Sequence, residues 1–186
     1  GVQWMTAAGG IIHSEMPEQE DGLMSGFQLW INLPAAEKMK PAGYQEYDAA
    51  DVPADERPGV TAKIVAGRTS TGVEGPVKGV TVEPLYAELV MEPGGVFEEP
   101  ISAEKTTILA IHSGSVSVAG IALPEAHLGV FGPGDTVRIE AGPQGARAIL
   151  AAGYPIREPI AWGGPFVMNT EGEVRQAMLD YQMGRF

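Results

Sequence analysis

The sequence contains no cysteine, which excludes a disulfide framework, a thiolate metal site and a thiol nucleophile. Any metal held by this chain must therefore take nitrogen and oxygen ligands. Basic residues are also scarce, because 12 Lys and Arg stand against 24 Asp and Glu, giving a formal net charge of −12. Such a surface repels a phosphate backbone, so we expect no direct binding to nucleic acids.

Long apolar runs are missing as well. No stretch approaches the roughly 18–20 consecutive apolar residues of a membrane span, and the N-terminus lacks the basic and apolar regions of a signal peptide. We therefore expect a soluble, cytoplasmic protein that does not contact a membrane. Core material is sufficient, since 44% of the 186 residues are hydrophobic although only 7% are aromatic.

Glycine and proline are abundant and predict an all-β fold. The 25 Gly and 15 Pro cut the chain into many short apolar runs, a pattern typical of a sandwich or barrel with tight turns. Apolar residues alternate with others between Phe27 and Leu33, which predicts a strand there. Further strands are expected at residues 61–66, 85–91, 107–112, 116–119, 128–131, 136–139 and 146–151. Residues 34–58 are polar, acidic and rich in proline, so we interpret them as a crossover linker.

One helix is expected, in the C-terminal tail. Thr170 and Glu173 have the spacing of a capping box, in which each side chain bonds the backbone of the other residue. Apolar residues follow at positions 174, 177, 178 and 181, which share one helical face. Gly184 stands where a helix commonly ends. The pattern predicts a short helix that begins after Thr170.

The triplet His13-Ser14-Glu15 is the strongest candidate for chemistry. The preceding Ile11 and Ile12 suggest a buried strand, on which residues i and i+2 point to the same face. An inward carboxylate must be paired or metal-bound to offset its desolvation. Imidazole and carboxylate suit non-haem Fe(II), although Mn, Ni, Cu or Zn fits the same ligand types. The alternative is an ordinary strand histidine, on the surface or in the core.

The other two histidines have no companion at a metal-binding spacing. His112 precedes the Ser113-Gly114 turn signal, and His127 lies in a loop after Pro124. We interpret both as turn histidines, either exposed or hydrogen-bonded. A complete metal site would therefore need donors other than these.

Several segments together resemble the pirin family of bicupins. They are VQWMTAAGGIIHSEM at 2–16, FQLWINLP at 27–34 with the following KMKP at 38–41, and EPIAWGGPFVMNTEGEVRQAMLDYQMGRF at 158–186. The resemblance implies two stacked cupin barrels, of which the N-terminal one binds iron through three histidines and one glutamate. It implies that His13 is the third histidine and Glu15 the glutamate. The first two histidines would belong to an H-x-H segment upstream of Gly1.

The resemblance also implies a domain arrangement. Residues 1–33 would be the remnant strands of the metal-binding cupin, 34–58 the linker, 59–160 a C-terminal cupin barrel (a double-stranded β-helix, or jelly roll) and 161–186 a tail with a short helix. The chain departs from metal-binding cupins after Gly94-Gly95, where strand residues 96–100 contain no histidine, and again near Val137. We therefore expect the C-terminal barrel to be free of metal.

The function implied by the resemblance is that of an iron-dependent dioxygenase that cleaves flavonols, of the quercetin 2,3-dioxygenase type. Glu15 would be both a metal ligand and the catalytic base, and the substrate would be a small, flavonol-like aromatic compound. The alternative is a metal-dependent, redox-sensitive regulatory protein that binds a transcription factor or a metabolic enzyme. A third possibility is a folded C-terminal cupin with neither activity. With two of four ligands, this chain alone is expected to bind metal weakly and to be inactive.

Overall fold

The computed structural model describes residues 1–14, 16, 21, 22 and 24–185. Strands dominate these residues, which confirms the expected all-β class. The elements are β1 Val2–Thr6, η1 Ala35–Glu37, β2 Gly43–Tyr47, η2 Ala49–Asp51, β3 Ala54–Arg57, β4 Val60–Ala66, β5 Leu85–Met91, β6 Val96–Pro100, β7 Thr106–Val118, β8 Ile121–Pro124, β9 Leu128–Val130, β10 Thr136–Gly153, β11 Ala161–Gly163, β12 Phe166–Met168 and α1 Glu171–Gln182. Among the described residues, no helix has both the length and the apolar character needed to cross a bilayer.

The chain folds into two compact units. The first, called the barrel unit, consists of Gly1–Trp4 and Gln45–Pro155. The second, called the tail unit, consists of Met5–Tyr44 and Ile156–Phe186. The domain limits expected from the sequence, at residues 33, 58 and 160, remain predictions.

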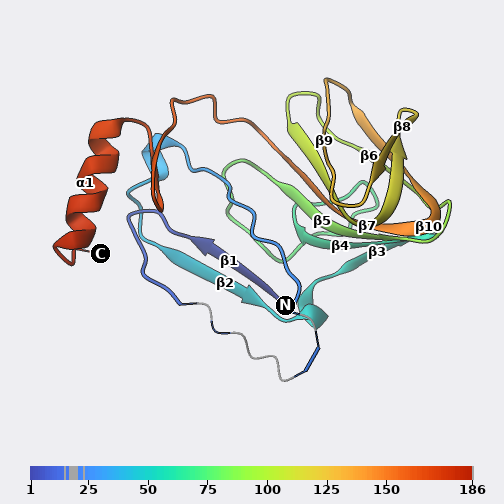
Figure 1. Ribbon diagram of the computed structural model, residues 1–186, viewed down its shortest axis with the longest axis horizontal. Coiled ribbons are helices and arrows are strands. Elements are labelled where there is room, and N and C mark those ends of the chain that lie inside the picture. The colour runs from blue at the N-terminus through green and yellow to red at the C-terminus, as the bar shows by residue number, and fades with distance from the viewer. Residues whose placement is uncertain (15, 17–20, 23, 186) are drawn as a thin grey trace. The chain divides into compact units, whose positions relative to one another are not determined.

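Two long strands, β7 and β10, shape the barrel unit (Figure 1). One half of β10 pairs with β6, where Val137 lies opposite Glu99, and the other half pairs with β5, where Leu150 lies opposite Ala87. Strand β7 pairs with both halves of β10 and also with β8 and β9. Strands β4 and β3 extend the sheet beyond β5. Each long strand runs through both sheets of the barrel. The two strands therefore join the sheets into one barrel.

Glycines allow these strands to continue where the sequence suggested turns. The register between β7 and β10 shifts between Ala141 and Ala146. Gly114 has φ +72°, and a Cβ added to it would lie 2.2 Å from the Gly145 carbonyl oxygen, so only glycine fits this close approach. The pairs of strands expected at 107–112 and 116–119, and at 136–139 and 146–151, are therefore two single strands with bulges.

The barrel is filled by aliphatic side chains from both sheets. Strand β5 alternates buried and half-buried residues along its whole length, which matches the period of a strand with one face on the core. The largest fully buried apolar side chains are Phe97, Ile64, Leu89, Leu109, Ile139 and Leu150. These residues come from five strands, so the core depends on pairings between distant parts of the chain.

In the tail unit, α1 covers the hairpin formed by β11 and β12. The predicted capping box is present, since the Thr170 hydroxyl accepts from the Glu173 backbone N–H and the Glu173 carboxylate accepts from that of Thr170. At the other end Gly184 has φ +65°, and the backbone N–H groups of Gly184 and Arg185 donate to the carbonyls of Tyr181 and Asp180. The helix therefore begins and ends where the sequence predicted.

The strand predicted over residues 27–33 is wrong. Residues 24–34 have no regular secondary structure, and Phe27 and Trp30 are exposed. A strand needs a partner for its backbone groups, and within the described residues no strand pairs with this segment. The buried strand predicted around Ile11 and Ile12 is wrong for the same reason, since residues 10–14 are also irregular and Ile12 is 71% exposed.

Candidate functional site

The predicted metal ligands lie just after the short turn that follows β1. His13 is exposed and belongs to the irregular segment 10–14. Glu15 lies outside the described residues, so the expected convergence of the two side chains on one face remains a prediction. The donor types, imidazole and carboxylate, fit a divalent transition metal. In the part of the chain that the structure describes, no three His, Asp or Glu residues form a group that could hold such an ion. A complete site needs donors beyond these two.

The C-terminal barrel has no histidine on strand β6, where a cupin would place two. Phe97 and Glu99 point inward from this strand and are opposite Ile139 and Val137 of β10. The interior of the barrel at this point therefore holds an aromatic ring and a carboxylate. The expectation of a metal-free barrel stays a prediction.

Glu99 belongs to a buried charge cluster with Asp55 and Arg57, both on β3. The two carboxylates are each only 2% exposed. The Arg57 guanidinium donates to Asp55 Oδ2 through Nε at 3.1 Å and Nη2 at 2.7 Å, and Nη2 also donates to Glu99 Oε2. Its Cζ lies 4.5 Å from the centre of the Phe97 ring. One cation thus serves two buried carboxylates and packs on an aromatic face.

The same carboxylates hold the loop that follows β4. The Ser70 backbone N–H donates to Glu99 Oε1 at 2.6 Å, and the Ser70 hydroxyl donates to Oε2 at 3.0 Å. The Thr71 hydroxyl donates to Asp55 Oδ2 at 2.8 Å. The partners of the two carboxylates named here are all hydrogen-bond donors, as buried carboxylates require.

Hydrogen bonding outweighs burial in setting the protonation of this cluster. Burial alone would raise the pKa of Asp55, but hydrogen bonds from Arg57, Thr71 and Thr69 together with the guanidinium charge lower it below the ordinary value of 3.8. Burial likewise opposes the charge on Arg57, yet its bonds to Asp55 and Glu99 leave the pKa of Arg57 raised. Asp55 and Arg57 are therefore both charged in the folded barrel.

We expect the barrel to lose stability in acid because of Asp55. A group whose pKa is lowered on folding contributes its full stabilisation above its unfolded value, here 3.8, and loses it as the pH falls through the lower folded value. Urea unfolding at a series of pH values should show this decline. Asp55→Asn should be less stable at neutral pH and should have a shallower acid slope, whereas Asp135→Asn, at an exposed loop residue, should keep the original slope. An unchanged slope in Asp55→Asn would contradict this account.

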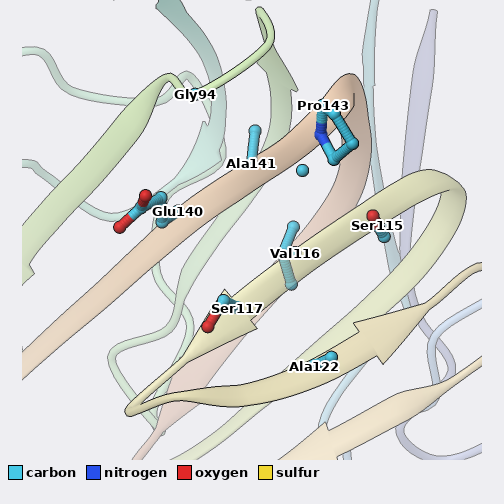
Figure 2. A pocket seen from close by; sticks show the side chains of 9 residues that line it. Gly94, Ser115, Val116, Ser117, Ala122, Glu140, Ala141 and Pro143 are labelled. Carbon is cyan, nitrogen blue, oxygen red and sulfur yellow. The ribbon is translucent and has the colours of Figure 1, made fainter.

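An open hollow of about 400 Å³ lies on the barrel unit between β7, β8 and β10 (Figure 2). Its lining is mainly apolar or small, including Val116 and Ala141, and the polar groups are the hydroxyls of Ser115 and Ser117 and the carboxylate of Glu140. The hollow is formed where β10 bulges, which the sequence did not predict because residues 136–139 and 146–151 were expected to be two separate strands. Its lining residues include none of the predicted metal ligands.

The two remaining histidines lie in the barrel unit. His112 is within β7 rather than in a turn; its Nε2 lies 3.9 Å from Glu88 Oε1, and burial, with the nearby Arg147 charge, lowers its pKa. His127 is exposed and its Nδ1 lies 3.0 Å from the Glu125 carbonyl oxygen, which confirms a hydrogen-bonded loop histidine. Neither lies in a group that could hold a metal, as far as the described residues show.

Several known proteins have sequences similar to that of this chain. A Pirin-like protein of Caulobacter vibrioides is 50% identical over an alignment that covers 100% of this chain and 67% of that protein. A Pseudomonas aeruginosa protein provisionally named a quercetin 2,3-dioxygenase is 44% identical and is matched over 99% of this chain and 67% of its own length. The chain thus spans about two thirds of the length of these relatives.

A solved structure and two family models lead to the same family. The crystal structure of a quercetin 2,3-dioxygenase from Acinetobacter baumannii superposes with a TM-score of 0.78 and 26% identity, over 84% of this chain and 55% of that one. The family model of the Pirin C-terminal cupin domain matches residues 86–186, and the Pirin model matches residues 1–31. The barrel unit is therefore a cupin barrel, and the chain belongs to the pirin family.

Proposed function

We propose that the protein functions as a metal-dependent dioxygenase that acts on flavonols. The observation that carries this proposal is the likeness to proteins named for that activity, at 44% identity in Pseudomonas aeruginosa and at a TM-score of 0.78 in Acinetobacter baumannii. Fold alone would be weak support, because one fold serves many functions. The sequence likeness extends over 99% of the chain.

In this proposal His13 and Glu15 supply two of the ligands of an iron ion, and two further histidines come from residues before Gly1. The metal, when bound, would hold the substrate hydroxyl and O2 next to each other. Glu15 has a second role as the base that accepts the proton of the flavonol hydroxyl. His13 is exposed, so its ring is accessible to a metal ion that is also held by other donors.

The test is oxygen uptake with quercetin by the iron-loaded protein, in its longest form with any residues encoded before Gly1. We expect Glu15→Gln to lower turnover by about 100-fold or more, the usual effect of losing a general base. His13→Ala should lower both turnover and bound iron, measured by metal analysis. His127→Ala is the matched control and should change neither.

Two results would count against the proposal. Unchanged turnover in Glu15→Gln would show that Glu15 is not the catalytic base. The regulatory alternative would be favoured by two results together. The protein would bind iron but consume no oxygen with any flavonol, and it would capture a protein partner in only one oxidation state of the iron.

A further inference from the structure

The C-terminal tail does not fold with the barrel that precedes it. The family model of the C-terminal cupin domain extends to residue 186, yet the structure groups Ile156–Phe186 with Met5–Tyr44, the segment that carries His13. The tail is therefore an integral part of the unit that contains the predicted metal ligand. Its contacts with that segment show how the two are held together.

Lys38 is the main link between the two segments of the tail unit. Its side chain follows η1 and is only 5% exposed, an unusual place for a lysine. The ammonium donates to Asn32 Oδ1 at 2.6 Å and to the Val167 carbonyl oxygen of β12 at 2.9 Å. These neutral acceptors and the nearby carboxylates of Glu158 and Glu173 favour the charged form of Lys38, but burial outweighs the carboxylates and lowers its pKa. Lys38 also stands in the KMKP motif through which the sequence resembles its family.

Glu158 makes a second link beside the first. Its Oε2 accepts from the Ala35 backbone N–H at the start of η1, at 2.7 Å, and from the Asn169 side-chain amide at 3.0 Å. Asn169 directly precedes the cap of α1, and its backbone N–H donates to the Glu173 carboxylate at 3.2 Å. The position of the helix is thus tied to η1 through one carboxylate.

The links continue toward His13. The Lys40 carbonyl oxygen, two residues after Lys38, accepts from the Gly9 backbone N–H at 3.0 Å. A Cβ on Gly9 would lie only 3.3 Å from that oxygen, so the two backbone segments are in close contact. Gly9 lies in the turn four residues before His13. The segment around Lys38 is therefore hydrogen-bonded directly to the segment that leads into the predicted ligands.

We propose that the C-terminal tail, residues 156–186, positions the His13 segment, and that Lys38 is the positioning residue that anchors the tail to it. This inference rests on the proposed function, since it assigns the tail a role in holding the metal-bearing segment. Lys38 acts through Val167, Asn32 and the Lys40–Gly9 bond and does not itself contact a ligand.

The experiment compares Lys38→Met, which keeps the length of the side chain but removes its charge and donors, with Lys40→Met. The Lys40 side chain pairs with Glu37 next to it and is a matched control. Hydrogen exchange followed by mass spectrometry should show exchange at least about tenfold faster in β12, α1 and residues 31–40 of Lys38→Met, because bonds from a charged donor are the stronger kind. Strands β5 and β10 should be unchanged, which shows that the barrel unit is folded. Glu158→Gln is a milder variant and should show the same pattern to a smaller degree.

The second readout is the release of iron from the loaded, longest form of the protein to a chelator. Lys38→Met should release iron about 10–100-fold faster than wild type, the range seen when residues that orient ligands are lost. Faster exchange in the tail with unchanged iron release would overturn the positioning role alone. A wild-type protein that holds no iron would overturn the proposed function, while the exchange data would still show whether Lys38 anchors the tail.

Discussion

Replacing Arg57 with methionine is expected to lower the free energy of unfolding of the barrel unit by about 3–5 kcal/mol. The variant leaves the carboxylates of Asp55 and Glu99 buried without a cation, and both are 2% exposed in the wild type. It also removes the guanidinium that packs 4.5 Å from the centre of the Phe97 ring. Methionine retains the bulk of the side chain, so the effect isolates the charge and its hydrogen bonds. Equilibrium unfolding in urea at neutral pH measures the difference.

Arg138→Met is the control for this experiment. Arg138 also interacts with two carboxylates, those of Glu98 at 3.6 Å and Glu140 at 3.3 Å, but all three side chains are about half exposed. Exposed pairs contribute about 0–1 kcal/mol, so the control should remain close to wild type. Equal effects in the two variants would show that burial does not govern the contribution of the Arg57 cluster.

Leu89→Ala should destabilise the barrel unit by about 2–5 kcal/mol. Leu89 lies at the middle of β5 with no exposed surface and faces the core shared by both sheets. The substitution removes apolar contacts and leaves a cavity that a barrel tied by strand pairing on every side cannot easily collapse. Thermal and urea unfolding should both report the loss, with an unchanged denaturant slope if the native fold persists.

Leu128→Ala is the matched control, since it makes the same change in the same barrel. Leu128 is on β9 and is 58% exposed. We expect a change of less than about 1 kcal/mol, because little apolar surface is removed from a packed environment. A large loss of stability in Leu128→Ala would mean that this side chain is covered in solution.

Local features of the fold could be predicted from the sequence. Strand β5 has the limits expected from its apolar residues, Leu85–Met91, because its alternation and its flanking turns lie within a few residues. The helix after Thr170 was predicted equally well, since a capping box and a terminal glycine are short-range signals. In both cases neighbouring residues determine the structure.

Features that depend on distant residues were missed. The irregular segment 24–34 has the alternating pattern of a strand, but a pattern cannot show whether a partner is present. Gly114 was interpreted as a turn because close approach to the Gly145 carbonyl, 31 positions later, is not visible in the sequence. The cluster of Asp55, Arg57 and Glu99 was also missed, since Glu99 lies more than 40 residues after the other two.

The candidate site was predicted by resemblance more than by pattern. His13 and Glu15 alone are a common triplet, and the strand on which they were expected is absent at residues 10–14. Lys38 had no signal beyond its place in a shared motif, because its burial depends on Val167 of β12, 129 positions away. Ligand types can be predicted from the sequence, but the groups that hold them in place require the fold.

The long strand β10 also determines when the barrel can form. It pairs with β5, β6 and β7, so neither sheet can be completed before residue 153 has been synthesised. At about 5–20 residues per second, the sixty or so residues after Met91 take several seconds to appear, and β5 waits that long for this neighbour. During synthesis, its apolar face is available to chaperones and to other nascent chains. Variants that slow the arrival or the pairing of β10 should therefore lower the yield of folded protein more than its final stability.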